Sequence, residues 1–326
     1  MASMAKMRDL LAWSTEHQPA PDDPNYVPPR PLEELDPGLI DMILGKPDAV
    51  RMRDAMAIAA DESKSEDDRV TALDDMELLI ESLDNANDLE VLKLWEPILN
   101  LATSTIPAIS AQALWVVGTA VQNNPKSQAA FLKHEPFPTI INALSSEKST
   151  NEIRAKALYV LSGALRHNRE AVVKFTEAKG WKALKAALED PHITVRRKAA
   201  FLLNALLLPD STLSSPDSTT SPLQTSDLTR SAIDTHNILS SLTSSIVNPK
   251  PFGRNTTTTA EPDADYEEKA VRGVVTYLEG MKGSQTDVGE GVKKDLRVLL
   301  GMKETERGKE WGLEEEEWDV LQRHAE

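Results

Sequence analysis

The stretch "ALYVLSGALRHN", residues Ala157–Asn168, decides the fold, because similar stretches occur at other places in the chain. "ALWVVGTAVQNN" begins 44 residues earlier at Ala113, and "AAFLLNALL" begins 42 residues later at Ala199. A weaker copy places Ala72 and Leu73 in register with Ala113 and Leu114, an offset of 41 residues. Each copy is apolar or small on almost every side, which is typical of a helix that is buried all round.

Helical repeats of about 40–47 residues are characteristic of armadillo and HEAT proteins, in which each unit buries the face of its neighbour. The segments between the copies, "VLKLWEPILNLA", "FPTIINALS" and "WKALKAALED", are predicted to be amphipathic outer helices. We therefore expect an all-α, armadillo-like right-handed solenoid of about four helical repeats with N- and C-terminal capping helices. Small residues inside the copies (Gly118, Gly163 and Ala205) are expected to let neighbouring helices approach closely.

The domain organisation follows from shifts in composition. Residues 1–35 contain a proline-rich stretch that cannot continue a helix, and we expect them to form a flexible N-terminal segment. The armadillo-like domain is expected over residues 36–303, with a Ser/Thr/Pro-rich insertion at 209–231 and a loop at 248–264. A helix is expected between them, over residues 232–247. Residues 304–326 are expected to form an acidic C-terminal tail, with the option of a short terminal helix.

Composition excludes several classes of function. The formal net charge of −16 disfavours nucleic-acid binding, because phosphates would be repelled. The chain has no cysteine, and its six histidines show no paired spacing, so neither a metal centre nor a catalytic cluster is expected. No apolar run reaches the ~20 residues of a membrane span, and no signal peptide is evident. We expect a cytoplasmic protein that is not an enzyme, has no cofactor and binds neither membrane nor nucleic acid.

The charge is unevenly distributed. Residues 61–90 carry 12 acidic and 2 basic side chains, whereas residues 148–198 carry 5 acidic and 12 basic ones. Such polarity can orient a partner of complementary charge. Two solvated faces with no binding role would give the same charge distribution.

Three stretches together carry a family resemblance: "LLAWS" near the start, "DPGLIDMILGKPDAVRMRDAM", and "ALDDMELLIESLDNANDLEVLKLWEPIL" at the first repeat. They resemble the Fes-type armadillo nucleotide-exchange factors, the fungal proteins that bind the 70-kDa heat-shock chaperone. The third stretch is the most specific, since we interpret it as an acidic helix ending in Asp84-Asn85-Ala86-Asn87, which generic armadillo repeats lack. The resemblance covers residues 7–205 well and the C-terminal third loosely.

The resemblance implies a co-chaperone that grips the ATPase domain of the chaperone, opens the nucleotide cleft and so releases ADP and promotes substrate release. It also implies that the N-terminal segment, with Leu10, Leu11 and Trp13, competes with substrate for the chaperone's peptide groove. A small amphipathic helix packed on the body is the alternative for that segment. We expect a monomer, as for a capped solenoid.

Candidate contacts with the chaperone lie at the polar ends and starts of the repeated helices. Asparagine as a helix cap and arginine paired with a neighbouring acid are the structural alternatives. A second functional hypothesis is an armadillo scaffold that binds extended peptides without exchange activity, but Trp115 is followed four residues later by Thr119 rather than by the asparagine of such grooves. The candidate residues are Glu81, Asn85, Asn87, Asn123, Asn124, Arg154, Arg196 and Arg197.

Overall fold

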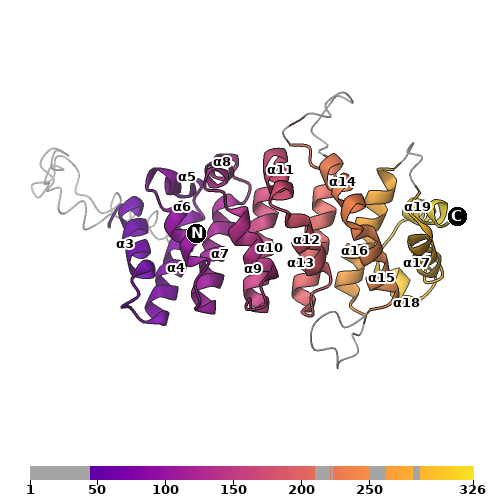
Figure 1. Cartoon of the computed structure of the whole chain (residues 1–326), viewed down its shortest axis with the longest axis horizontal. Coiled ribbons are helices and arrows are strands. Elements are labelled where there is room, and N and C mark those ends of the chain that lie inside the picture. Colours follow the sequence, from indigo (N-terminus) through magenta and orange to yellow (C-terminus); the bar gives the residue numbers. More distant parts are fainter. Residues whose placement is uncertain (1–44, 210–220, 222, 250–261, 282–286) are drawn as a thin grey trace, which may run out of the picture. The chain divides into compact units, whose positions relative to one another are not determined.

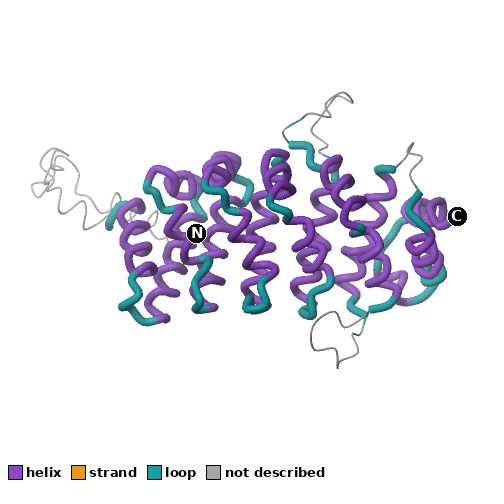
Figure 2. The backbone as a smooth tube through the Cα atoms, viewed as in Figure 1, coloured by secondary structure: helices purple, strands orange, loops and turns teal. Residues whose placement is uncertain are grey.

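The computed structural model describes residues 45–209, 221, 223–249, 262–281 and 287–326. Residues Asp48–Glu326 form one compact unit, distinct from Met1–Pro47. Every regular element in the described residues is a helix, as Figure 2 shows. The prediction of an all-α fold is confirmed.

The described helices fall into four three-helix repeats, each made of two short helices followed by a long one. Two helices, α3 (Asp48–Ala60) and α4 (Glu66–Ile80), precede the first repeat, and α17 (Glu290–Leu300), α18 (Glu306–Glu310) and α19 (Glu315–Ala325) follow the last. The repeats are α5 (Leu83–Val91), α6 (Trp95–Leu101) and α7 (Pro107–Val121); α8 (Pro125–Lys133), α9 (Phe137–Ser145) and α10 (Asn151–Leu165); α11 (Arg169–Glu177), α12 (Gly180–Leu188) and α13 (Ile193–Leu207); and α14 (Ser226–His236), α15 (Ile238–Val247) and α16 (Ala264–Glu279).

The long helices are the repeated stretches of the sequence. The helices α4, α7, α10, α13 and α16 pack one against the next in chain order, and Figure 1 shows them as a row. Close approach depends on the predicted glycines: a Cβ at Gly118 would lie 2.2 Å from Cδ1 of Tyr159, and one at Gly163 would lie 2.9 Å from Cγ2 of Val121. The predicted role of these two glycines is confirmed.

The asparagines at the ends of the quoted stretches form the joints between repeats. Asn123 and His167 have positive φ values of 48° and 53°, so each ends a long helix in the left-handed region. Asn124 and Asn168 then cap the next short helix, and their side-chain oxygens accept the backbone N–H of Ser127 (3.2 Å) and Ala171 (3.0 Å). The third copy has Pro209 in place of His167, and proline cannot adopt a positive φ; the Ser/Thr/Pro-rich segment follows it.

A chain of aromatic rings joins the short helices of successive repeats. Trp95 lies 5.3 Å from Phe131, which lies 6.5 Å from Phe137. Phe137 lies 5.6 Å from Phe175, and Phe175 lies 5.4 Å from Trp181, all between ring centres. All five rings are buried. Although aromatic residues make up only 5% of the chain, these five are concentrated where repeats meet.

Two helix boundaries differ from the sequence expectations. The segment Asp84–Asn87 does not end the long acidic helix; α4 ends at Ile80 and the four residues lie in the short helix α5. The apolar segment of residues 232–247 is not one helix, because Asn237 adopts a φ of 52° and separates α14 from α15. In both places the chain turns to begin a new helix of the repeat, which hydrophobic periodicity alone does not reveal.

The acidic residues 304–326 are folded onto the last repeat. In this segment Trp311 and Trp318 are stacked with their ring centres 5.9 Å apart, and both are buried. The helix α19 begins with a capping box between Glu314 and Glu317. Its acidic first turn and basic last turn suit the helix dipole, so the acidic composition supports a helix here.

Candidate functional site

The five long helices present one continuous face, which we call the long-helix face. Two sets of equivalent positions define it, three residues apart on each helix, so that both lie on the same side. The set nearer the helix starts is Thr71, Gln112, Lys156, Lys198 and Lys269, and the following set is Asp74, Trp115, Tyr159, Phe201 and Arg272.

Polar contacts tie this face together at its N-terminal end. Gln112 on α7 donates a hydrogen bond to Asp74 on α4, and Thr119 donates to the buried carboxylate of Glu77 at 2.7 Å. Gln122 donates to the backbone oxygen of Tyr159 at 3.3 Å. These contacts link α4, α7 and α10 directly, so the spacing of their exposed side chains is held by the fold.

Aromatic side chains remain accessible in the middle of the face. Trp115 is 37% exposed and Phe201 is 47% exposed, which is unusual for such large apolar groups in a chain with few aromatics. The ammonium nitrogen of Lys156 lies 3.2 Å from the centre of the Trp115 ring. Tyr159 and Phe201 line one pocket of about 410 Å³ together with Lys198. Exposed aromatic groups with cations beside them are typical of protein-binding surfaces.

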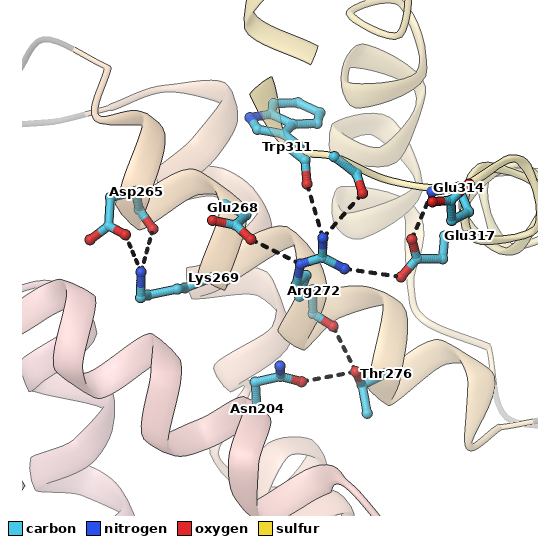
Figure 3. A network of polar contacts seen from close by, with 10 residues as sticks. Asn204, Asp265, Glu268, Lys269, Arg272, Thr276, Trp311, Glu314 and Glu317 are labelled. Carbon is cyan, nitrogen blue, oxygen red and sulfur yellow. Dashed lines mark hydrogen bonds and ion pairs between the residues drawn. The ribbon is translucent and has the colours of Figure 1, made fainter. Parts of the chain in front are cut away.

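The C-terminal end of the face is a network of ion pairs, shown in Figure 3. Arg272 on α16 bonds Glu268 at 3.1 Å and reaches Glu317 of α19 and the backbone oxygen of Trp311 at 3.5 Å each. Lys269 donates to Asp265 one turn earlier on the same helix. The cations at this end are therefore occupied by carboxylates of the chain itself.

Among the predicted contact residues near the start of the first repeat, Glu81 is exposed just after the end of α4. Asn85 is partly buried and donates to the backbone oxygen of Leu79 at 2.8 Å and to Asp48 at 2.9 Å. Asn87 lies one helical turn away from the exposed Leu83, and its side-chain oxygen is buried without a hydrogen-bond partner among the described residues. Asn85 thus has a structural role, whereas Glu81 is accessible.

Asn123 and Asn124 belong to the joint between the first two repeats. Asn123 is exposed, and Asn124 is only 5% exposed because it caps α8. Neither residue lines the pocket of Tyr159 and Phe201.

The three predicted arginines are all engaged within the chain. Arg154 bonds both carboxylate oxygens of Asp190, at 2.6 and 3.0 Å, and so joins the second repeat to the third. Arg196 is 7% exposed and stacks on the ring of Tyr266 at 5.3 Å. Arg197 lines the pocket of Tyr159 and Phe201 and bonds Asp263, whose carboxyl pKa it lowers through that hydrogen bond.

As chaperone contacts, all eight residues stay predictions. The structure brings only Arg197 beside the exposed aromatic groups. The 42-residue offset that aligns Ala157 with Ala199 also aligns Lys156 with Lys198 and Tyr159 with Phe201, so the repeat itself carried the signal for this surface.

The described residues contain no group of three or more acidic or histidine side chains that could hold a metal ion. None of their helices combines the length and apolar character needed to cross a bilayer. The predicted release residues Leu10, Leu11 and Trp13 lie outside the described residues.

Comparison of the fold with solved structures identifies the class of protein, the armadillo repeat proteins. Similar solved structures include a designed armadillo repeat protein in complex with the peptide (KR)4, with a TM-score of 0.59 and 11% identity over 86% of this chain and 100% of that one. Computationally designed armadillo repeat proteins for modular peptide recognition are similar with a TM-score of 0.57 and 11% identity, over 86% of this chain and 100% of that one. At such identity the likeness establishes the fold alone, and the predicted armadillo-like solenoid is confirmed.

The family follows from the sequence comparisons. The family described as "Nucleotide exchange factor Fes1" matches residues 7–89, and the "SIL1/FES1/HPBP1 C-terminal domain" matches residues 85–287. The chain belongs to the Fes1 family of nucleotide exchange factors, as its resemblance implied, and this is not a family of catalytic enzymes.

Relatives named "Hsp70 nucleotide exchange factor FES1" occur in several fungi. The relative from Mycosarcoma maydis is 38% identical over 74% of this chain and 72% of its own length. The one from Cryptococcus neoformans is 42% identical over 61% of this chain and 57% of its own length. The one from Schizosaccharomyces pombe is 36% identical over 62% of this chain and 70% of its own length.

Proposed function

We propose that this chain is a nucleotide exchange factor of a cytosolic Hsp70, the 70-kDa heat-shock chaperone, and binds its ATPase domain with the long-helix face. The single observation that carries the proposal is membership of the Fes1 family. The accessible aromatic groups Trp115 and Phe201 support the choice of face, since aromatic anchors dominate the binding energy of many interfaces. The chain acts as a monomer and needs no cofactor.

The exchange mechanism is thermodynamic linkage. If the long-helix face binds the open, nucleotide-free ATPase domain more tightly than the closed, ADP-bound form, ADP must bind the complex more weakly by the same factor. No side chain of this protein then needs to touch the nucleotide. Equal affinity for both forms would leave ADP release unchanged.

This mechanism requires the long-helix face to be rigid, because a face that adapts to both forms of the chaperone cannot distinguish them. The aromatic chain from Trp95 to Trp181 and the hydrogen bonds from Gln112 and Thr119 support such rigidity. Close packing of α7 on α10 at Gly118 adds to it.

The test is release of a fluorescent ADP analogue from purified Hsp70, with and without this protein. Acceleration of release is expected, together with tighter binding to nucleotide-free than to ADP-loaded Hsp70. Equal affinity for both states would refute the mechanism. Replacement of Phe201 by glutamate is expected to weaken binding by about tenfold or more. Val173→Glu is a matched control, because Val173 is 39% exposed on the short helix α11 and does not belong to the long-helix face.

The N-terminal segment has a separate role in this proposal. Residues 1–30, with Leu10, Leu11 and Trp13, compete with substrate for the peptide groove of Hsp70. Deleting them is expected to leave ADP release intact and to slow the release of a bound model peptide. Loss of ADP release on deletion would refute this division of labour.

The peptide-adaptor hypothesis gains no support from the long-helix face. A peptide groove needs side-chain amides that bond the peptide backbone, but Trp115, Tyr159 and Phe201 are followed four residues later by Thr119, Gly163 and Ala205. Thr119 is in addition bonded to Glu77.

A further inference from the structure

Two lysines on adjacent long helices of this acidic protein have no carboxylate partner. Lys156 on α10 and Lys198 on α13 make no ion pair with any described residue, although other cations of the face, such as Arg197 and Lys269, do. The two lysines occupy equivalent positions in successive repeats and point to the same face.

The ammonium group of Lys156 lies in an unfavourable environment. Its pKa is lowered chiefly by burial, and the charge of Lys198 lowers it further, which means that the two ammonium groups repel each other. Glu152 on α10 and Glu77 and Asp74 on α4 raise this pKa without pairing with the lysine. The Trp115 ring, 3.2 Å from the lysine nitrogen, replaces part of the lost hydration.

Three of the nearby carboxylates have partners elsewhere. Asp74 accepts from Gln112 and Glu77 accepts from Thr119, both within the N-terminal part of the face. Asp265 pairs with Lys269 and with Arg197. Glu152, one helical turn before Lys156 on α10, influences the pKa of this lysine but forms no ion pair with it.

Apolar surface lies immediately beside the two cations. Trp115 covers one side of Lys156, and Tyr159 and Phe201 line the pocket of about 410 Å³ that also contains Lys198. Lys156 is half-buried and Lys198 is exposed. A pair of cations beside aromatic side chains favours an anion that is itself carried on an apolar segment, because binding of that segment excludes water and strengthens the attraction between the opposite charges.

We propose that Lys156 and Lys198 receive carboxylates of the Hsp70 ATPase domain, from a segment whose neighbouring apolar side chains pack on Trp115, Tyr159 and Phe201. This inference rests on the proposed function and names the chemistry of the partner at that site. The acidic helix α4 at one end of the face repels the carboxylates of the same chaperone segment. The charge pattern therefore fixes the register in which the chaperone binds.

The first experiment measures the Kd for nucleotide-free Hsp70 by calorimetry. Lys156→Gln and Lys198→Gln are each expected to weaken binding several-fold, and the double reversal Lys156→Glu/Lys198→Glu by about a hundredfold. Lys182→Glu is the matched control, since Lys182 is exposed on the outer helix α12 and makes no ion pair with a described residue. It is expected to bind like the wild-type protein. Helical content and melting temperature are compared for every variant.

The second experiment locates the contact without mutation. A carbodiimide joins a lysine to a carboxylate only when the two are in direct contact, and mass spectrometry identifies the pair. Lys198 or Lys156 is expected to be joined to an aspartate or glutamate of the ATPase domain. Cross-links from other lysines but from neither of these two would overturn the inference.

The outcomes separate the two proposals. If the wild-type protein accelerates ADP release and the double reversal variant, folded like the wild type, does so equally well, the carboxylate contact is wrong and the exchange function stands. If the wild-type protein neither binds Hsp70 nor accelerates release, both proposals fail. Strong salt dependence of wild-type binding that is reduced in the Lys156→Gln/Lys198→Gln variant supports the contact.

Discussion

Replacement of Glu267 by glutamine is expected to weaken the attachment of the C-terminal helices to the last repeat. Glu267 on α16 is 2% exposed. One carboxylate oxygen accepts from Arg307 at 2.6 Å, and the other accepts from Arg307 at 2.8 Å and from the Trp311 ring nitrogen at 3.1 Å. This buried ion pair joins α16 to α18.

The magnitude follows from what glutamine leaves behind. Removing one partner of a buried ion pair costs about 3–5 kcal/mol, because the remaining charge stays buried without compensation. The Arg307 side chain is 27% exposed and also donates to the backbone oxygen of Ile246 at 2.6 Å, so part of its charge remains solvated and bonded. We therefore expect about 3 kcal/mol, the lower end of that range.

Tryptophan fluorescence during urea unfolding measures this loss, because Trp311 and Trp318 lie in the affected segment. In a solenoid each unit is stabilised mainly by its neighbours, so hydrogen exchange is expected to rise first in residues 290–326. Glu268→Gln is the matched control: Glu268 pairs with Arg272 at the surface, which is worth at most about 0.5 kcal/mol. A loss below about 1 kcal/mol for Glu267→Gln, or equal losses for the two variants, would refute the reasoning.

Two further predictions concern the long helices. Gly118→Ala is expected to destabilise the protein by about 1–3 kcal/mol, because the added Cβ would overlap the Tyr159 ring. Gly273→Ala is expected to stabilise it by up to about 1 kcal/mol, because the added Cβ would meet no atom closer than 3.9 Å. Urea unfolding measures both changes, and equal effects of the two substitutions would contradict the prediction. The hydrogen bond from Arg197 holds the pKa of the Asp263 carboxyl below its ordinary value, so this pair contributes stability above the unfolded-state value of about 3.9 and loses it as the pH falls through the folded value. The stability difference between wild type and Arg197→Gln is therefore expected to be constant from pH 7 to about 5 and to shrink below about pH 4, and a difference that grows on acidification would contradict the assignment.

The candidate site was only partly predictable, because neighbouring positions in a helix have different surroundings. Arg196 and Arg197 are adjacent in the sequence, yet Arg196 is buried against Tyr266 and Arg197 lines the open pocket. Trp115 is 37% exposed, whereas Trp95 and Trp181 are fully buried. Residue type gives no means of telling these cases apart, since the packing of the next repeat decides them.

The sequence by itself determined the architecture. The spacing of 41–44 residues between copies of one apolar helix fixed the class of fold, the number of repeats and the glycines at which helices meet. Such information is local and periodic, and every repeat confirms it in the same way. The first short helix of the second and third repeats was the exception, because Asn123 and His167, with positive φ, create the boundary without interrupting the hydrophobic pattern.

Only the tertiary structure decided which polar groups are free. Hydrogen bonds, helix caps and ion pairs within the chain engage Asn85, Asn124 and Arg154. By contrast, no described carboxylate forms an ion pair with Lys156 or Lys198. Pairing depends on distances between helices that are some 40 residues apart in the sequence, as the Arg154–Asp190 and Thr119–Glu77 contacts show. Composition and periodicity carry no record of those distances, which arise when the repeats pack together.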